Sequence, residues 1–253
     1  MRNMRFATIV RKIAPFAMLA AAATSGCSGS DIRLNGSDGV PLSELDMSGA
    51  APEEITLIGP DRVLVSQGSQ FGITVDQGAE QAEQLRFVLE DGSLGITRTA
   101  SWMGSRAMAT IRVTLSSPPR KLSVTGSGEM TSESLAGSAE VLIAGSGTLE
   151  TPGVAADALD VSIAGSGDYR ATGHARSLDL SIAGSGNADL GRLKVDTADL
   201  SIAGSGDAVF ASDGEVNASI MGSGDVTVRG SARCTVNTMG SGTLTCERGG
   251  AAG

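Results

Sequence analysis

Apolar and polar residues alternate along much of the second half of the chain. In residues 159–164 (LDVSIA) large aliphatic residues occupy every second position, and polar or small residues lie between them. This period of two predicts a β-strand with one buried face. The alternation recurs in phase at residues 178–183 and 199–203, and more loosely at 217–221. The pattern therefore predicts a series of equivalent strands.

Each of these stretches is followed by Gly-Ser-Gly, a tripeptide that occurs seven times at spacings of 19, 20, 19, 20, 18 and 18 residues. A sharp corner between strands requires positive φ or very small side chains, and glycine provides both. We expect the central serine to bond to nearby backbone or to its neighbour in a stack. The predicted corners begin at Gly126, Gly145, Gly165, Gly184, Gly204, Gly222 and Gly240.

The period fits one coil of a β-solenoid, because about 19 extended residues have a contour of roughly 60 Å, enough for two or three short strands. Stacked coils place like residues above one another and pair each backbone with its neighbours. The repeats therefore predict a parallel β-helix over residues 121–247. Leucine-rich repeats are disfavoured because the asparagine ladder is missing. A transmembrane barrel is disfavoured because residues 27–253 contain only five aromatic residues, too few for two aromatic girdles.

The part of the chain before the repeats, residues 54–120, is also rich in predicted strands. Short apolar runs are bounded there by Gly, Pro, Asp or Ser. Asp91 and Gly92 lie between two runs and predict a hairpin turn. We interpret this part as a strand-rich N-terminal cap. The runs are residues 55–58, 62–65, 71–75, 85–89, 94–97 and 110–115.

The first 53 residues predict an export signal and a tether. Residues 1–26 combine four basic residues with an apolar, alanine-rich run, which is typical of a cleaved signal. Gly26 and Cys27 match a bacterial lipobox, so Cys27 is a candidate lipidation site, although Thr24 stands where leucine is usual. Ordinary cleavage after Ala23 is the alternative. Residues 27–53 predict a flexible tether, and residues 248–253 a disordered tail.

The charge of the chain limits its partners. The formal charge is −9, and without residues 1–26 it becomes −13, from 15 basic and 28 acidic residues. Such a surface repels nucleic acid and anionic lipid headgroups. We therefore expect no nucleic-acid partner, and contact with a membrane only through a lipid anchor.

The two C-terminal cysteines predict a disulfide in an oxidising compartment. Cys234 lies six residues before Gly240 and Cys246 six residues after it, at positions that earlier repeats fill with apolar core residues. A bridge between them would fasten the last coil, with a contribution of about 3 kcal/mol for a loop this short.

The sequence offers no catalytic constellation, and we predict no catalytic residue, no metal site and no cofactor. His174 is the only histidine, and the nucleophile elbow Gly-x-Ser-x-Gly is absent. Asp168, Asp207 and Asp225 follow corner glycines and could bind cations weakly, but capping of the turns explains them better. The repeats also lack the long loops that build a groove in polysaccharide-cleaving β-helices.

Residues 122–128 (LSVTGSG), followed by repeated SIAGSGD motifs, resemble the bacterial head GIN domain family, an autotransporter adhesin head. The resemblance covers residues 55–247. It implies a right-handed β-helix in an exported bacterial protein and supplies no catalytic residues. We therefore expect a non-enzymatic cell-envelope protein that is adhesin-like and binds a protein or glycan.

For localisation, Ser28 after Cys27 favours an outer-membrane lipoprotein, with a periplasmic or secreted protein as the alternative. The alternative functions are a periplasmic structural or envelope-stress scaffold and, less favoured, a polysaccharide-active enzyme.

Overall fold

The computed structural model describes residues 39–76, 79–99 and 108–248. The predicted export signal, Cys27 and residues 249–253 of the predicted tail lie outside these ranges. Arg248, which we assigned to the tail, is instead the last residue of a strand.

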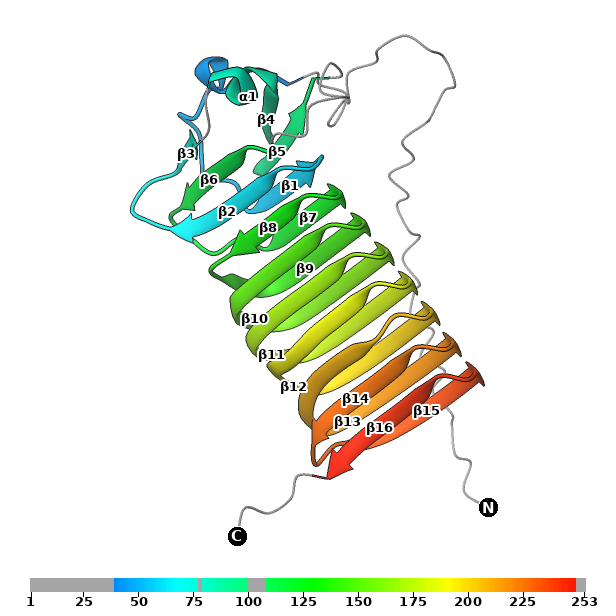
Figure 1. Ribbon diagram of the computed structural model, residues 1–253. Coiled ribbons are helices and arrows are strands. Elements are labelled where there is room, and N and C mark those ends of the chain that lie inside the picture. Colours follow the sequence, from blue (N-terminus) through cyan, green and yellow to red (C-terminus); the bar gives the residue numbers. More distant parts are fainter. Residues whose placement is uncertain (1–38, 77–78, 100–107, 249–253) are drawn as a thin grey trace, which may run out of the picture.

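The repeats form a stack of parallel coils, so the predicted β-solenoid is confirmed (Figure 1). Each long strand runs round one edge of the stack and contributes to both faces. Equivalent residues pair in register from coil to coil, as Ile163, Ile182 and Ile202 do. The strands are β7 (Lys121–Gly126), β8 (Glu129–Ser132), β9 (Leu135–Gly145), β10 (Thr148–Gly165), β11 (Asp168–Gly184), β12 (Asn187–Gly204), β13 (Ala208–Gly222), β14 (Asp225–Gly230), β15 (Arg233–Gly240) and β16 (Thr243–Arg248).

The core is the space between the two faces, filled by the alternating apolar residues that the sequence predicted. The columns are aliphatic for most of their length, and Leu159, Val161 and Ile163 are at most 1% exposed. Tyr169 fits because its neighbours on the adjacent coils are Leu149 and Ala188. Its hydroxyl lies 2.7 Å from the hydroxyl of Thr151, and both residues are buried. Burial raises the pKa of this phenol above its usual range.

All six strands predicted before the repeats are present in the structure. The turn at Asp91 and Gly92 joins β4 to β5, and both residues have positive φ, 49° and 75°. Two short helices, η1 (Leu42–Glu44) and α1 (Ala79–Gln84), were not predicted. The strands are β1 (Glu54–Ile58), β2 (Arg62–Gln67), β3 (Gly72–Val75), β4 (Leu85–Glu90), β5 (Ser93–Arg98) and β6 (Thr110–Leu115).

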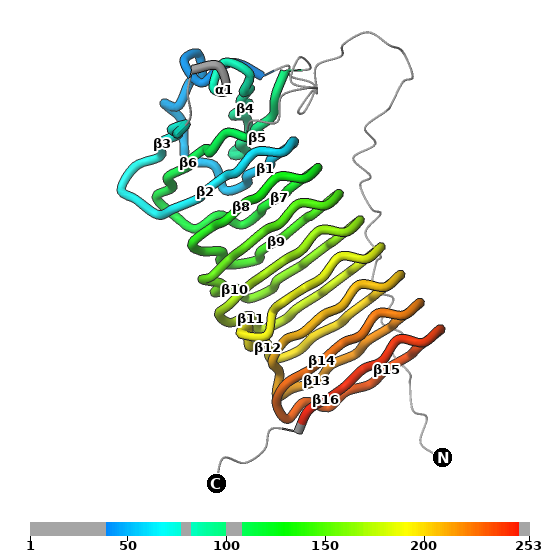
Figure 2. The backbone as a smooth tube through the Cα atoms, in the orientation of Figure 1, coloured from blue at the N-terminus to red at the C-terminus, as the bar shows by residue number. Residues whose placement is uncertain are grey.

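This strand-rich N-terminal part is continuous with the solenoid, since its strands belong to the same sheet. β1 pairs in parallel with β7, and β2 pairs in parallel with β8. On their other sides β1 and β2 pair in parallel with β5 and β6. The coil of β1 and β2 therefore lies between two coils that come later in the chain (Figure 2). Of the described strands, β3 and β4 pair in the antiparallel direction, and they cover the outer edges of β6 and β5.

A buried ion pair holds this coil order together. Asp61, in the corner between β1 and β2, accepts hydrogen bonds from Nε and Nη2 of Arg98 at 2.6 and 2.5 Å. It also accepts one from the backbone N–H of Ala109 at 2.7 Å. Both charged side chains are at most 1% exposed. The corner between β1 and β2 is thereby joined to the end of β5 and to Ala109, which precedes β6.

The described part of the predicted tether lies against the fold. Val40 and Phe87 exchange backbone hydrogen bonds at 2.9 and 2.8 Å. Leu42, Leu45 and Ala51 pack on the hydrophobic core. A free tether is therefore the wrong description for residues 39–53, because this segment covers apolar surface at the end of the stack.

The predicted disulfide between Cys234 and Cys246 is present and connects β15 to β16, with Cα atoms 6.6 Å apart. Both cysteines occupy core columns but are only partly buried. In the described residues β15 and β16 have a neighbouring strand on one side only, so the columns are open at this end.

Candidate interaction surface

The seven Gly-Ser-Gly corners form one edge of the solenoid, which we call the corner edge. The first glycine of each corner has φ between 110° and 136°, a region that side chains disfavour. The second glycine is required by close packing. A Cβ on Gly167 would lie 2.6 Å from the carbonyl oxygen of Gly147 and 2.5 Å from Cγ2 of Ile143. The corner edge is consequently tight and regular.

The corner serines form a row of exposed hydroxyl groups along this edge. From Ser146 onward, the backbone N–H of each serine bonds to the carbonyl of the first glycine in the preceding coil, at 2.8–2.9 Å. Their hydroxyl groups make no hydrogen bond to other described residues, which differs from our expectation. The row, at about the 4.8 Å spacing of strands, can therefore bond to a ligand. Its members are Ser127, Ser146, Ser166, Ser185, Ser205, Ser223 and Ser241.

A second polar row follows the corners, and its side chains cap the next coil. Asp207 accepts a hydrogen bond from the N–H of Asp225 at 2.8 Å, and Asp225 accepts one from the N–H of Thr243 at 3.1 Å. Asn187 donates to Asp168 at 3.0 Å. We predicted capping of the local turn, but these side chains bond to the backbone amide of the next coil. Asn187 separates Asp168 from Asp207, and all three carboxylates already accept hydrogen bonds, so their arrangement gives no support to the weak cation site.

An acidic column lies on the face formed by β7, β9 and the second halves of β10–β12. Glu140, Asp160, Asp179 and Asp199 are neighbours in register. Partial burial raises the pKa of Asp160, and the negative charges of Asp179 and Glu140 add to this effect. Lys121 lies beside Glu140 at 3.0 Å and offsets part of the repulsion. This face therefore carries concentrated negative charge.

Ion pairs between successive coils line the edge opposite the corners. Arg176 lies 3.3 Å from Asp157, and Lys194 lies 2.8 Å from Asp213. This contact lowers the pKa of Asp213 and raises the pKa of Lys194. His174 is exposed on this edge, and its Nε2 lies 3.3 Å from Asp196. His174 therefore lies in the same row of contacts between coils.

The described residues do not gather groups suited to catalysis. Within residues 39–76, 79–99 and 108–248, no three His, Cys, Asp or Glu side chains form a group that could hold a metal ion. A shallow depression on the β12–β15 face is lined by Asp199, Asn217 and Ser219, among others, without a histidine or cysteine. In this part of the chain no helix is long and apolar enough to cross a membrane.

Comparison with known families gives a match over residues 51–232 to the family described as "Putative auto-transporter adhesin, head GIN domain". The chain belongs to the head GIN domain family. The last coil lies beyond the matched residues. No curated protein matches this chain.

Solved structures share the fold of this head GIN domain. A "putative adhesin" from Bacteroides fragilis has 18% sequence identity and a TM-score of 0.69, over 78% of this chain and 93% of that one. A "putative lipid binding protein" from Parabacteroides distasonis has 22% identity and a TM-score of 0.60, over 79% and 94%. A "putative adhesin" from Parabacteroides merdae has 18% identity and a TM-score of 0.60, over 80% and 94%.

Proposed function

We propose that this protein is a non-enzymatic, adhesin-like module of the cell envelope, and that its corner edge binds a glycan. The row of seven exposed serine hydroxyls is the observation that carries the proposal. Regularly spaced donors and acceptors suit a polymer that repeats its own hydroxyl groups. The membership of the head GIN domain family supports an adhesin-like role.

A glycan suits the corner edge better than a protein does. Protein interfaces depend on a few buried aromatic or arginine anchors. Next to the serine row lie Ala144, Ala164, Ala183 and Ala203, and the column ends in Met221 and Met239, so it contains neither an aromatic residue nor an arginine. The acidic column on the adjacent face also disfavours anionic polymers, so a neutral or cationic glycan is the expected ligand.

We further propose that the protein is exported and held at the outer membrane by a lipid on Cys27, which is supported by the lipobox-like Gly26-Cys27. The alternative is a periplasmic scaffold without an external ligand. Protease treatment of intact cells distinguishes the two, with a periplasmic protein as the control for membrane integrity. Cleavage of the domain while the control survives is expected, and protection until the outer membrane is opened would contradict surface exposure.

Binding is tested with purified protein and an array of neutral, cationic and anionic envelope polysaccharides. The variant Ser166→Ala/Ser185→Ala/Ser205→Ala should lose at least about tenfold in affinity for the glycan that the protein binds. A matched control removes three stacked serine hydroxyls from the face of the acidic column, at Ser162, Ser181 and Ser201. Equal affinity of the two triple variants, or release of shortened polysaccharide during incubation, would contradict the proposal.

A further inference from the structure

The two ends of the solenoid are built differently. At the N-terminal end β3 and β4 run antiparallel to the last parallel strands, and Val40 pairs with the outer strand β4. At the other end β15 pairs only with β13, and β16 only with β14, within the described residues. An edge strand of this kind presents unpaired N–H and C=O groups that can pair with another strand.

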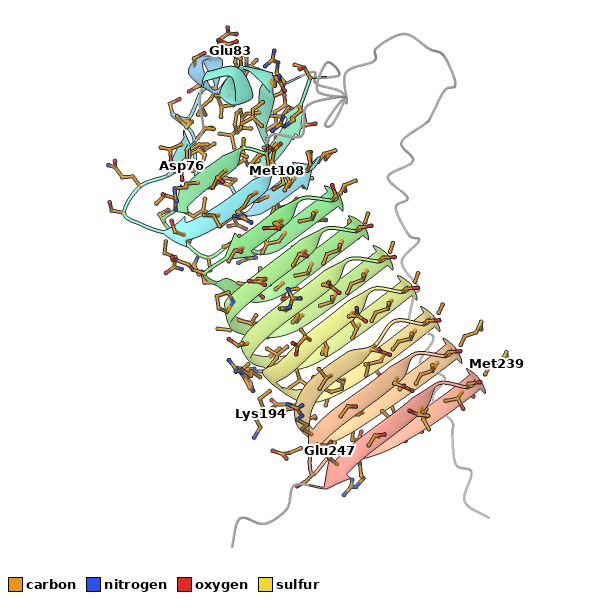
Figure 3. All side chains as sticks on the ribbon, viewed as in Figure 1. Asp76, Glu83, Met108, Lys194, Met239 and Glu247 are labelled. Carbon is orange, nitrogen blue, oxygen red and sulfur yellow. A yellow bond between two sulfur atoms is a disulfide. The ribbon has the colours of Figure 1, made fainter. Side chains whose placement is uncertain are left out.

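Apolar side chains are exposed at this C-terminal end. Val236 is 46% exposed although it continues the core column of Ala218. Leu244 is only partly buried, beside the disulfide. Met221 and Met239 are stacked neighbours, 58% and 70% exposed, and Figure 3 shows Met239 at the corner side of the last coil. The open edge thus combines unpaired backbone with apolar surface.

The negative charge of the solenoid, which we also call the rod, decreases towards this C-terminal end. The acidic column of Asp199 continues as Asn217 and then as Thr235. The row of Asp207 and Asp225 ends in Thr243. In a chain with a formal charge of −9, the last coil therefore presents no carboxylate in either column to an approaching molecule. Among its described side chains only Arg233 and Glu247 are charged, with opposite signs.

We propose that the open C-terminal edge binds the same edge of a second copy, so that two rods join end to end. Two identical ends meet only if one rod is reversed, which gives two-fold symmetry and antiparallel pairing of the edge strands. Inward-facing residues such as Val236 and Leu244 would then cover the open core of the partner. The neutral ends of the acidic columns let the two rods approach without opposed carboxylates.

The association should be weak and reversible. β15 and β16 together contain 14 residues, fewer than the 20–30 residues per partner of a standard interface. Thr238 also takes the place of Ile220 in the core column, which makes the buried surface partly polar. We therefore expect monomer and dimer to coexist, with the dimer favoured at high protein concentration. This inference does not depend on glycan binding.

Sedimentation velocity over a wide range of protein concentration tests the proposal. The wild type should shift from monomer to dimer, and Val236→Lys should weaken association at least tenfold. A lysine there can reach solvent in the monomer, but its charge would be buried in the dimer. The control is Met47→Lys, which introduces the same charge at a different exposed apolar residue, 38% exposed, and this variant should associate like the wild type. A wild type that stays monomeric, or equal effects of the two substitutions, would overturn the proposal.

Hydrogen exchange of the wild type locates the contact without any substitution. Amides of β15 and β16 should exchange more slowly as the concentration rises, while those of β3 and β4 stay unchanged. Protection of β15 and β16 already in the monomer would mean that a segment of the same chain covers the edge. Concentration-dependent protection elsewhere would place the interface on another surface. Either result would overturn the proposal.

Discussion

The substitution Asp61→Asn should destabilise the N-terminal coils strongly. Asp61 is fully buried and accepts three hydrogen bonds, two from Arg98 and one from the N–H of Ala109. The amide keeps the size of the side chain but removes the negative charge that lies beside the buried guanidinium of Arg98. Breaking a buried pair from one side costs about 3–5 kcal/mol, and we expect a loss of this size in the free energy of unfolding.

Equilibrium urea unfolding measures this loss, and hydrogen exchange of β1, β5 and β6 shows where it occurs. A matched control is Glu150→Gln, which breaks the ion pair with Arg170 between side chains that are 44% and 50% exposed. An exposed pair contributes only about 0–1 kcal/mol, so this variant should unfold almost as the wild type does.

A double substitution distinguishes the contribution of the ion pair from the cost of removing only one of its two charges. Asp61→Leu/Arg98→Met removes both charges and fills a similar volume, so it should cost less than Asp61→Asn alone. A loss below about 1 kcal/mol for Asp61→Asn, or a double variant that is less stable than Asp61→Asn, would refute the reasoning.

Three further predictions concern the repeats. Gly165→Ala should lower the free energy of unfolding by about 1–3 kcal/mol, because φ at this residue is 122°. Ser166→Ala, at the exposed neighbour, should change the free energy of unfolding by less than about 0.5 kcal/mol. Urea unfolding measures both. Cys234→Ser should lower the free energy of local opening of β15 and β16, measured by hydrogen exchange, by about 3 kcal/mol. The opening of β10–β12 should not change, because each coil contacts only its neighbours. Asp160→Asn should raise Tm at neutral pH. The raised pKa means that the folded state binds the proton more tightly than the unfolded state does, so stability falls as pH rises from the ordinary 3.8 through the raised value.

Each of these predictions has an outcome that would contradict it. Equal stability of the Gly165 and Ser166 variants would show that the corner tolerates a side chain. Faster exchange throughout the rod after loss of Cys234 would show that the coils unfold together. A gain in Tm for Asp160→Asn that persists unchanged at pH 3 would exclude charge as its cause.

The sequence by itself determined the repetitive part of this protein. The alternation in residues 159–164 and the returning Gly-Ser-Gly fixed which residues are strands, which are corners and which face the core. Such features are local, since each strand and corner depends on a few consecutive residues. Cys234 and Cys246 could be paired because the repeat itself supplied their three-dimensional positions.

The order of the N-terminal coils became known only from the tertiary structure. Their strands were predicted one by one, but no period relates β1, β5 and β7, so the sequence did not reveal that β1 lies between the other two. Asp61 and Arg98, 37 residues apart, could not be recognised as partners before that order was known. The exposure of the corner serines also became evident only from the stacked coils. Local patterns specify elements, whereas pairing between distant segments depends on which packing buries the most apolar surface and pairs the buried charges.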